Sequence, residues 1–219
     1  MNSVCIPLRE WSRGEELANS LSHGVGFLAA VIGTPFLLVA AQQHGGSRSL
    51  LAMSIFATTT MLLYFASAVH HWLLPGPAKN FFEVMDHAAI FLMIAGTYTP
   101  FALGFLWGPW GWLLMGLIWP LALFGVLLKS LRGVQPRAFS ISLYVLMGWT
   151  AVIAYKPFME HMPPTGLWLL VAGGLAYTGG LVFYLARRIP YHHLAWHIAV
   201  LLGTAFHYFT VLHYALGTT

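Results

Sequence analysis

Seven long apolar stretches run along the sequence, and short segments between them hold most of the charged residues. Each stretch is long enough to cross about 30 Å of hydrocarbon as an α-helix, and no alternation of apolar and polar residues indicates a transmembrane barrel. The pattern therefore predicts an all-α membrane protein, a seven-transmembrane helix bundle. The predicted spans lie near Leu17–Ala41, Leu50–Leu74, Asp86–Leu106, Trp110–Leu128, Ala138–Tyr155, Gly166–Ala186 and Tyr191–Leu216.

The same pattern predicts a simple domain organisation. Residues 1–16 form a short polar, cytoplasmic N-terminal segment, and residues 17–219 form a single seven-helix transmembrane domain. Only Trp107–Pro109 separates the third span from the fourth, and its Gly-Pro pair predicts a tight turn. Three prolines lie inside predicted spans and are expected to kink them: Pro35, Pro100 and Pro120.

Composition strengthens the membrane assignment. Lys, Arg, Asp and Glu make up 7% of the residues and hydrophobic residues 58%, whereas charged residues make up roughly 25% of an average soluble domain. So few charges cannot cover the surface of a soluble domain, which excludes most soluble enzymes, nucleic-acid-binding proteins and disordered proteins. The net charge of +4 does not indicate a nucleic-acid partner, because the basic residues are scattered. Cys5 is the only cysteine, which excludes an intramolecular disulfide and a cysteine-based metal cluster.

The basic residues predict which side of the membrane each loop faces. With the N-terminus in the cytoplasm, only Arg48 and Lys156 fall on the outer side. This bias follows the positive-inside rule and predicts, after seven spans, a C-terminus outside the cell. The basic residues on the cytoplasmic side are then Arg9, Arg13, Lys79, Lys129, Arg132, Arg137, Arg187 and Arg188.

Ionisable side chains within spans are the informative ones, because each is costly in hydrocarbon unless it is paired or binds a metal. The chain has eleven histidines, and Asp86 is its only aspartate. Three span ends on the predicted cytoplasmic side carry such residues. They are His70 and His71 at the second span, Asp86 and His87 at the third, and His192, His193 and His197 at the seventh.

The spacing of these residues predicts a metal site. His193 and His197 are four residues apart and therefore lie one turn apart on one helix face. Neutral imidazoles at this spacing can hold one Zn²⁺, and His71 is the best candidate for a third ligand. Three protein ligands leave a fourth position open, as in catalytic zinc sites. Asp86 is then placed to act as a base or to orient a ligand, and Ser67 lies one turn before His71.

Two other interpretations of these histidines stay open. A single pair at this spacing is a weak indication of a metal, because buried histidines often serve packing alone. The neighbouring His70, His87 and His192 point elsewhere on their helices, so they are interpreted as interfacial or as outer contacts of the site.

A second polar row follows one face of the first span. Glu16, Asn19 and His23 recur there at helical spacing. We interpret the row first as a hydrogen-bonded seam between helices, and second as a direct part of the chemistry.

Four segments stand out together: EELANSLSHGVG (Glu15–Gly26), SAVHH (Ser67–His71), DHAAIFLMIAGTYTPF (Asp86–Phe101) and HLAWH (His193–His197). This combination, in this order, resembles the hemolysin III family, the bacterial relatives of the progestin and adipoQ receptors. That superfamily includes the adiponectin receptors and is related to the alkaline ceramidases. The resemblance covers nearly the whole chain.

The resemblance implies a seven-helix bundle with a cytoplasmic N-terminus and a zinc ion in the cytoplasmic half. It also implies relatedness to enzymes that hydrolyse lipid amides. By position in the motifs, the zinc ligands fall on His71, His193 and His197, the aspartate that holds the zinc-bound water on Asp86, the motif serine on Ser67, and the first-helix Glu, Asn and His on Glu16, Asn19 and His23.

Three hypotheses about function follow. The first is zinc-dependent, ceramidase-like hydrolysis of a membrane lipid amide or ester. Asp86 is its predicted general base, and Ser67 or another polar group is predicted to stabilise the oxyanion. The second is a non-enzymatic membrane sensor or regulator of lipid homeostasis in which zinc is structural. The third is cytolytic activity, as the family name implies, although a chain with seven spans is ill suited to secretion as a soluble toxin. The expected location is the bacterial inner (plasma) membrane.

Two other seven-span classes are excluded. A retinal protein needs a lysine in its last span for the Schiff base, and the predicted last span contains none. A di-haem cytochrome needs matched histidine pairs on two helices. His193 and His207 form such a pair on the seventh span, but no other span offers its counterpart.

Overall fold

The computed structural model of the protein describes residues 11–134 and 137–215, and every regular element among them is helical. Seven helical segments in this part of the chain are long and apolar enough to cross a membrane, the fifth being built from three consecutive elements over Ala138–His161. The predicted seven-span, all-α bundle is thereby confirmed. The elements are α1 (Arg13–His44), α2 (Gly46–Trp72), α3 (Pro77–Leu103), α4 (Pro109–Arg132), α5 (Arg137–Gly148), the 3₁₀ segment η1 (Thr150–Ala154), α6 (Tyr155–His161), α7 (Pro164–Leu185) and α8 (His192–Tyr214).

The helix starts follow from local sequence. At the start of α1, the backbone N–H of Glu15 donates to Ser12 Oγ, and the backbone N–H of Ser12 donates to the Glu15 carboxylate, which forms a capping box. A proline occupies the first turn of α3, α4 and α7, where its missing N–H removes no helical hydrogen bond. These caps place the helix ends, and with them the polar residues that the helix ends carry.

The third span begins earlier than predicted. α3 starts at Pro77, whereas the apolar pattern predicts a start at Asp86. The first turns of α3 carry Lys79, Asn80 and Glu83, whose polarity hides a helix from a pattern that counts apolar residues alone. Asp86 therefore lies well inside the helix, and Lys79 lies on its first turn rather than in a loop.

The fifth span is not one continuous α-helix. α5 ends at Gly148, a 3₁₀ segment follows, and α6 contains Pro157, which lacks a backbone donor. Tyr98 of α3 compensates for the break, since its hydroxyl lies 2.8 Å from the Gly148 carbonyl oxygen and accepts the Ala151 N–H at 2.8 Å. A broken helix at membrane depth needs such partners for its freed backbone groups.

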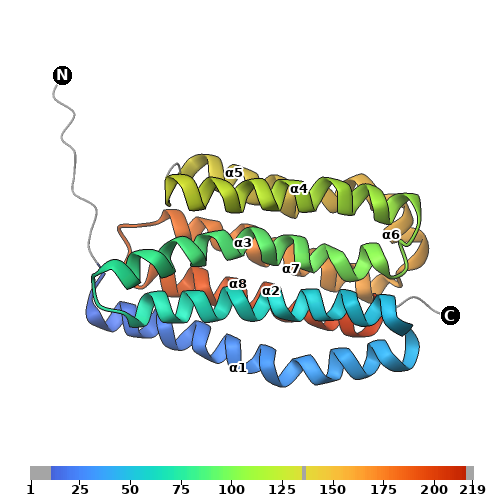
Figure 1. Ribbon diagram of the computed structural model, residues 1–219, viewed down its shortest axis with the longest axis horizontal. Coiled ribbons are helices and arrows are strands. Elements are labelled where there is room, and N and C mark those ends of the chain that lie inside the picture. The colour runs from blue at the N-terminus through green and yellow to red at the C-terminus, as the bar shows by residue number, and fades with distance from the viewer. Residues whose placement is uncertain (1–10, 135–136, 216–219) are drawn as a thin grey trace.

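The bundle brings the predicted site residues to one end (Figure 1). The beginnings of α1, α3 and α8 and the end of α2 all lie at the left end in this view. α2 packs between α1 and α3, and α8 packs against both α1 and α7. Residues far apart in the sequence thus share one level of the bundle.

Apolar side chains cover the outside of the bundle, and the buried ionisable side chains lie inside it. Large apolar side chains such as Ile32, Leu131 and Trp168 are more than 65% exposed, as expected for a surface that faces lipid. Among the described residues, the buried histidines and buried acidic residues, with a few polar neighbours, gather instead at the shared end of α1, α2, α3 and α8. They are Glu15, Asn19, Ser20, His23, Ser67, His70, His71, Asp86, His192, His193 and His197.

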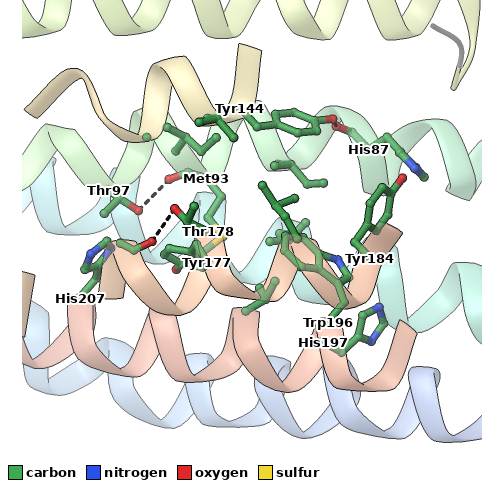
Figure 2. A pocket seen from close by; sticks show the side chains of 18 of the residues that line it. His87, Met93, Thr97, Tyr144, Tyr177, Thr178, Tyr184, Trp196, His197 and His207 are labelled. Carbon is green, nitrogen blue, oxygen red and sulfur yellow. Dashed lines mark hydrogen bonds between the residues drawn. The ribbon is translucent and has the colours of Figure 1, made fainter. Parts of the chain in front are cut away.

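A cavity of about 140 Å³ leads away from this polar end between α3, α5, α7 and α8 (Figure 2). Asp86, His193 and His197 line its one end, and His207 lines the other. A second cavity, of about 260 Å³, continues past His207 to the break in the fifth span, and Gly174 lines both cavities. Most of the remaining lining residues are apolar or aromatic, so the polar end opens onto a space suited to an apolar chain.

Candidate metal centre

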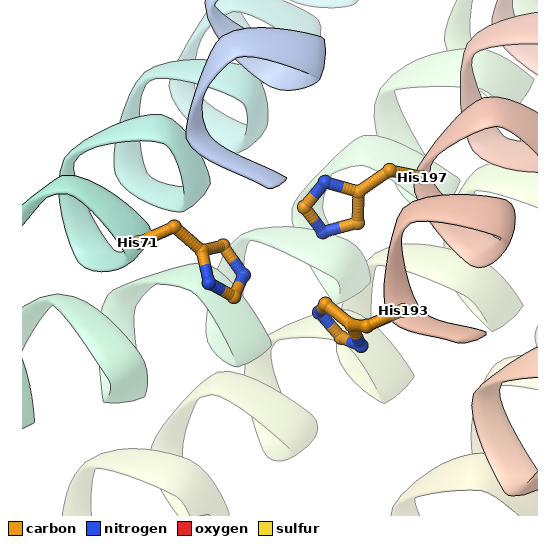
Figure 3. A group of neighbouring side chains, drawn as sticks. All are labelled: His71, His193 and His197. Atoms are coloured by element: carbon orange, nitrogen blue, oxygen red, sulfur yellow. The ribbon is translucent and has the colours of Figure 1, made fainter. Parts of the chain in front are cut away.

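Three histidines converge at the polar end of the bundle (Figure 3). His71 comes from the last turn of α2, and His193 and His197 come from the first turns of α8. One ring nitrogen from each lies within 4.8 Å of the others, and all three residues are buried. The structure therefore brings together the three residues that the sequence predicts as ligands, in a group that could hold a metal ion.

The hydrogen bonds of His71 and His197 fit a metal, whereas His193 Nδ1 is buried without a partner in the described residues. His71 Nδ1 lies 2.6 Å from a carboxylate oxygen of Glu16, whereas its Nε2 is buried and finds no hydrogen-bond partner among residues 11–134 and 137–215. His197 Nδ1 lies 3.1 Å from the Asn19 carbonyl oxygen. Each contact fixes a proton on Nδ1 and leaves Nε2 with its lone pair, which is the form that binds a divalent cation. Buried nitrogens without a partner are rare unless a ligand or ion completes them.

Glu16 stands at the centre of a second set of contacts. One of its oxygens meets His71, and the other accepts a hydrogen bond from Lys79 Nζ at 2.8 Å. Lys79 also donates to the carbonyl oxygens of His70 and Leu73, at 3.1 and 3.3 Å. Four carbonyl groups at the end of any helix lack a partner within the helix, so Lys79 serves as a cap for α2 as well.

The polar row of α1 faces the histidines. The ring of His23 stacks on that of His197, with centroids 3.5 Å apart and an interplanar angle of 6°. The Asn19 backbone holds His197, as described above, and its side-chain amide is buried without a hydrogen-bond partner in the described part of the chain. Glu16, Asn19 and His23 thus contact the candidate ligands directly, but in the described residues only Glu16 of the three makes side-chain hydrogen bonds.

Asp86 and Ser67 lie beside the group. Asp86 is buried in α3 and lines the same cavity as His193 and His197. The Ser67 hydroxyl is buried in α2 and makes no hydrogen bond within the described residues. The structure therefore places a carboxyl group on the cavity side of the three histidines.

The neighbouring histidines have other partners. His70 Nδ1 lies 3.3 Å from the Lys79 carbonyl oxygen. His192 Nδ1 lies 3.1 Å from the Phe183 carbonyl oxygen, and its Nε2 accepts a hydrogen bond from the Trp11 indole at 3.3 Å. The rings that converge are therefore those of His71, His193 and His197, and not those of their sequence neighbours His70 and His192.

The haemolysin-III-related family model matches residues 11–208. The chain belongs to the haemolysin III family. It is similar to hemolysin-3 of Bacillus cereus, with 38% identity over 93% of each chain. It is also similar to a hemolysin-3 homolog of Bacillus subtilis strain 168, with 38% identity over 92% of this chain and 95% of that one. The human monocyte to macrophage differentiation factor is 24% identical over 91% of this chain and 84% of its own length.

In this haemolysin III protein, three residues at the candidate metal centre could not be identified from the sequence. Lys79 appears in the sequence only as a basic residue near a span end. Trp11 packs its ring over the group, with centroids 4.5 Å from His193 and 5.4 Å from His71. Their proximity depends on tertiary packing, and neither residue belongs to a motif with metal-ligand spacing.

Glu15 is the third residue of this kind. Its carboxylate accepts hydrogen bonds from the backbone N–H of Ser12 and, at 2.8 Å, from that of Tyr191. Tyr191 immediately precedes α8 and has a φ of 56°, a left-handed conformation that is unusual for a bulky residue. Glu15 therefore ties the start of α1 to the start of α8 and supports the position of His193.

Proposed function

We propose that this protein is a zinc-dependent membrane hydrolase that cleaves an amide or ester bond of a membrane lipid. The single observation that carries the proposal is the pairing of a buried three-histidine group with a carboxyl group at the mouth of an apolar cavity. Three imidazole ligands suit Zn²⁺ and leave a position for chemistry. Bound there, Zn²⁺ supplies Lewis acidity that polarises the carbonyl of a lipid.

The protein's own residues supply the remaining functions in this proposal. Glu16 and the Asn19 carbonyl hold His71 and His197 in the tautomer that binds zinc. Asp86 acts as general base for the attacking water and then returns the proton to the leaving amine or alcohol. The apolar cavity receives the acyl chain and directs its carbonyl towards the histidines.

We further propose that the site faces the cytoplasm from the bacterial plasma membrane. Arg13, Arg187 and Arg188 flank the end of the bundle that holds the histidines. At the opposite end, Arg48 donates to the Leu103 carbonyl oxygen and lies over the Trp107 ring. The excess of basic residues at the site end supports a cytoplasmic orientation.

The test is turnover by purified protein in lipid nanodiscs. A panel of lipid amides and esters, ceramides included, is incubated with protein as prepared, protein treated with a chelator, and treated protein resupplied with Zn²⁺. We expect fatty acid release that disappears with the chelator, returns with zinc and is abolished in Asp86→Asn. Glu160→Gln, a carboxyl change at the other end of the bundle, should retain the activity.

Two results would overturn the proposal. The first is the absence of zinc from protein prepared without a chelator, which would exclude a zinc-dependent reaction. The second is protein that holds zinc but releases no fatty acid from any lipid of the panel. This result would favour the sensor hypothesis, in which zinc is structural. Haemoglobin release from erythrocytes exposed to the same preparation tests the cytolytic hypothesis separately.

A further inference from the structure

Lys79 is a basic side chain at the candidate metal centre that has no role in the proposed chemistry. It reaches from the first turn of α3 to Glu16 on α1, with 2.8 Å between Nζ and the carboxylate. The side chains of Lys79 and Glu16 are only 16% and 20% exposed, so water screens this pair far less than a surface ion pair. An exposed ion pair can serve solubility alone, but this pair is partly buried beside the three histidines, which indicates a further role.

The two carboxylate oxygens of Glu16 have different partners. One binds the ammonium group of Lys79, and the other accepts the proton of His71 Nδ1 at 2.6 Å. The ammonium group thereby fixes the carboxylate in the orientation that His71 requires. His71 in turn presents Nε2, which has no other partner in the described residues, to the other two histidines. Carboxylate–histidine pairs of this kind set both the tautomer of a ligand and its strength as a donor.

We propose that Lys79 is a positioning residue of the metal centre, acting through Glu16 on the ligand His71. The inference rests on the metal site of the proposed function but not on lipid hydrolysis. It extends the centre to four helices, because α3 supplies Lys79 and α1 supplies Glu16 beside the ligands of α2 and α8. A shift of α1 or α3 at this end of the bundle is then transmitted to a metal ligand.

A simpler role has to be separated from this one. Lys79 also caps the end of α2 through the carbonyl oxygens of His70 and Leu73. A residue that only caps a helix would affect stability, and its effect would not depend on Glu16. A positioning residue would affect metal affinity, and its effect would vanish once Glu16 can no longer transmit it.

A double-mutant cycle on metal affinity distinguishes these roles. Zn²⁺ affinity of the full chain in nanodiscs is measured by chelator competition for wild type, Lys79→Met, Glu16→Gln and the double variant. We expect each single change to weaken binding by about 10- to 100-fold, the range for partners of a ligand, and the double change to be no worse than the stronger single. Lys79→Arg, which keeps the positive charge, should retain most of the wild-type Zn²⁺ affinity. Lys156→Met, in the exposed pair with Glu160, should have no effect.

A second measurement does not need the metal. In metal-free protein with ¹⁵N-labelled histidine, the His71 ring nitrogens report which of them carries the proton. We expect the Nδ1–H form in wild type and a mixture of tautomers in Lys79→Met and in Glu16→Gln. Unchanged metal affinity in Lys79→Met, effects that add to those of Glu16→Gln, or an unchanged His71 tautomer would each overturn the inference. Wild-type protein without zinc affinity would overturn the proposed function instead, and the tautomer would still decide the role of Lys79.

Discussion

The hydroxyl of Tyr98 in α3 lies 2.8 Å from the carbonyl oxygen of Gly148, where the helix of the fifth span breaks. The same hydroxyl lies 2.9 Å from the Met147 carbonyl oxygen and accepts the N–H of Ala151. One hydroxyl thus contacts three backbone groups at the break, and its single proton is shared by the two carbonyl oxygens. Because Tyr98 and Gly148 also line both cavities, this contact shapes the space that leads to the histidines.

Tyr98→Phe should destabilise the protein without altering its metal content. The change removes a hydroxyl whose one proton is shared by two carbonyl oxygens and whose oxygen accepts the Ala151 N–H. An unsatisfied buried polar group costs about 1–3 kcal/mol. Thermal unfolding in nanodiscs should show a lower midpoint, with zinc stoichiometry unchanged. Tyr155→Phe is the matched control, since Tyr155 is 66% exposed. Equal midpoints for the two variants would contradict the role assigned to Tyr98.

Neighbouring histidines should differ sharply in their importance for metal binding. His193→Ala should weaken Zn²⁺ binding by more than the roughly 100-fold that loss of a ligand's partner can cause, because it removes a ligand outright. His70→Ala should leave zinc stoichiometry intact, since His70 is engaged with the Lys79 backbone. Elemental analysis of purified variants provides the measurement. Loss of zinc in His70→Ala with retention in His71→Ala would reverse the assignment.

Much of this centre could be predicted from sequence because its spacing is local. His193 and His197 share a helix face whatever the rest of the bundle does, and the end of the second span fixes the depth of His71. The seven spans could be predicted as well, because length and apolar composition suffice to identify them. Local rules of this kind do not depend on the path of the chain through space.

The contacts between helices could not be predicted in the same way. Glu16 meets His71 across 55 positions of sequence, and Trp11 meets His192 across 181. The early start of α3 was missed because polar first turns carry no apolar signal. The break of the fifth span was missed because its compensating partner, Tyr98, belongs to another helix.

Trp11 should slow the exchange of the metal with the aqueous phase. Its indole packs against His193 and His71, and Trp11 does not line the apolar cavity. Trp11→Ala should speed zinc extraction by a chelator about threefold to tenfold, the factor equivalent to one lost aromatic contact. Trp72→Ala is a matched control at the same end of the bundle, because Trp72 is 65% exposed. Equal extraction rates for the two variants would show that Trp11 does not shield the site.

Adjacent glycines of α7 should respond in opposite ways to the same substitution. A Cβ on Gly173 would overlap the ring of His207, which is held by the Leu170 carbonyl oxygen, so Gly173→Ala should cost about 1–3 kcal/mol through overpacking. A Cβ on Gly174 would meet no described atom within 4 Å, and this residue lines both cavities. Gly174→Ala should therefore keep the wild-type unfolding midpoint. Gly174→Leu should keep it too, while its larger side chain fills the cavity and lowers lipid turnover at unchanged zinc content. A loss of stability in Gly174→Ala equal to that in Gly173→Ala would show that this part of the cavity is closed by packing.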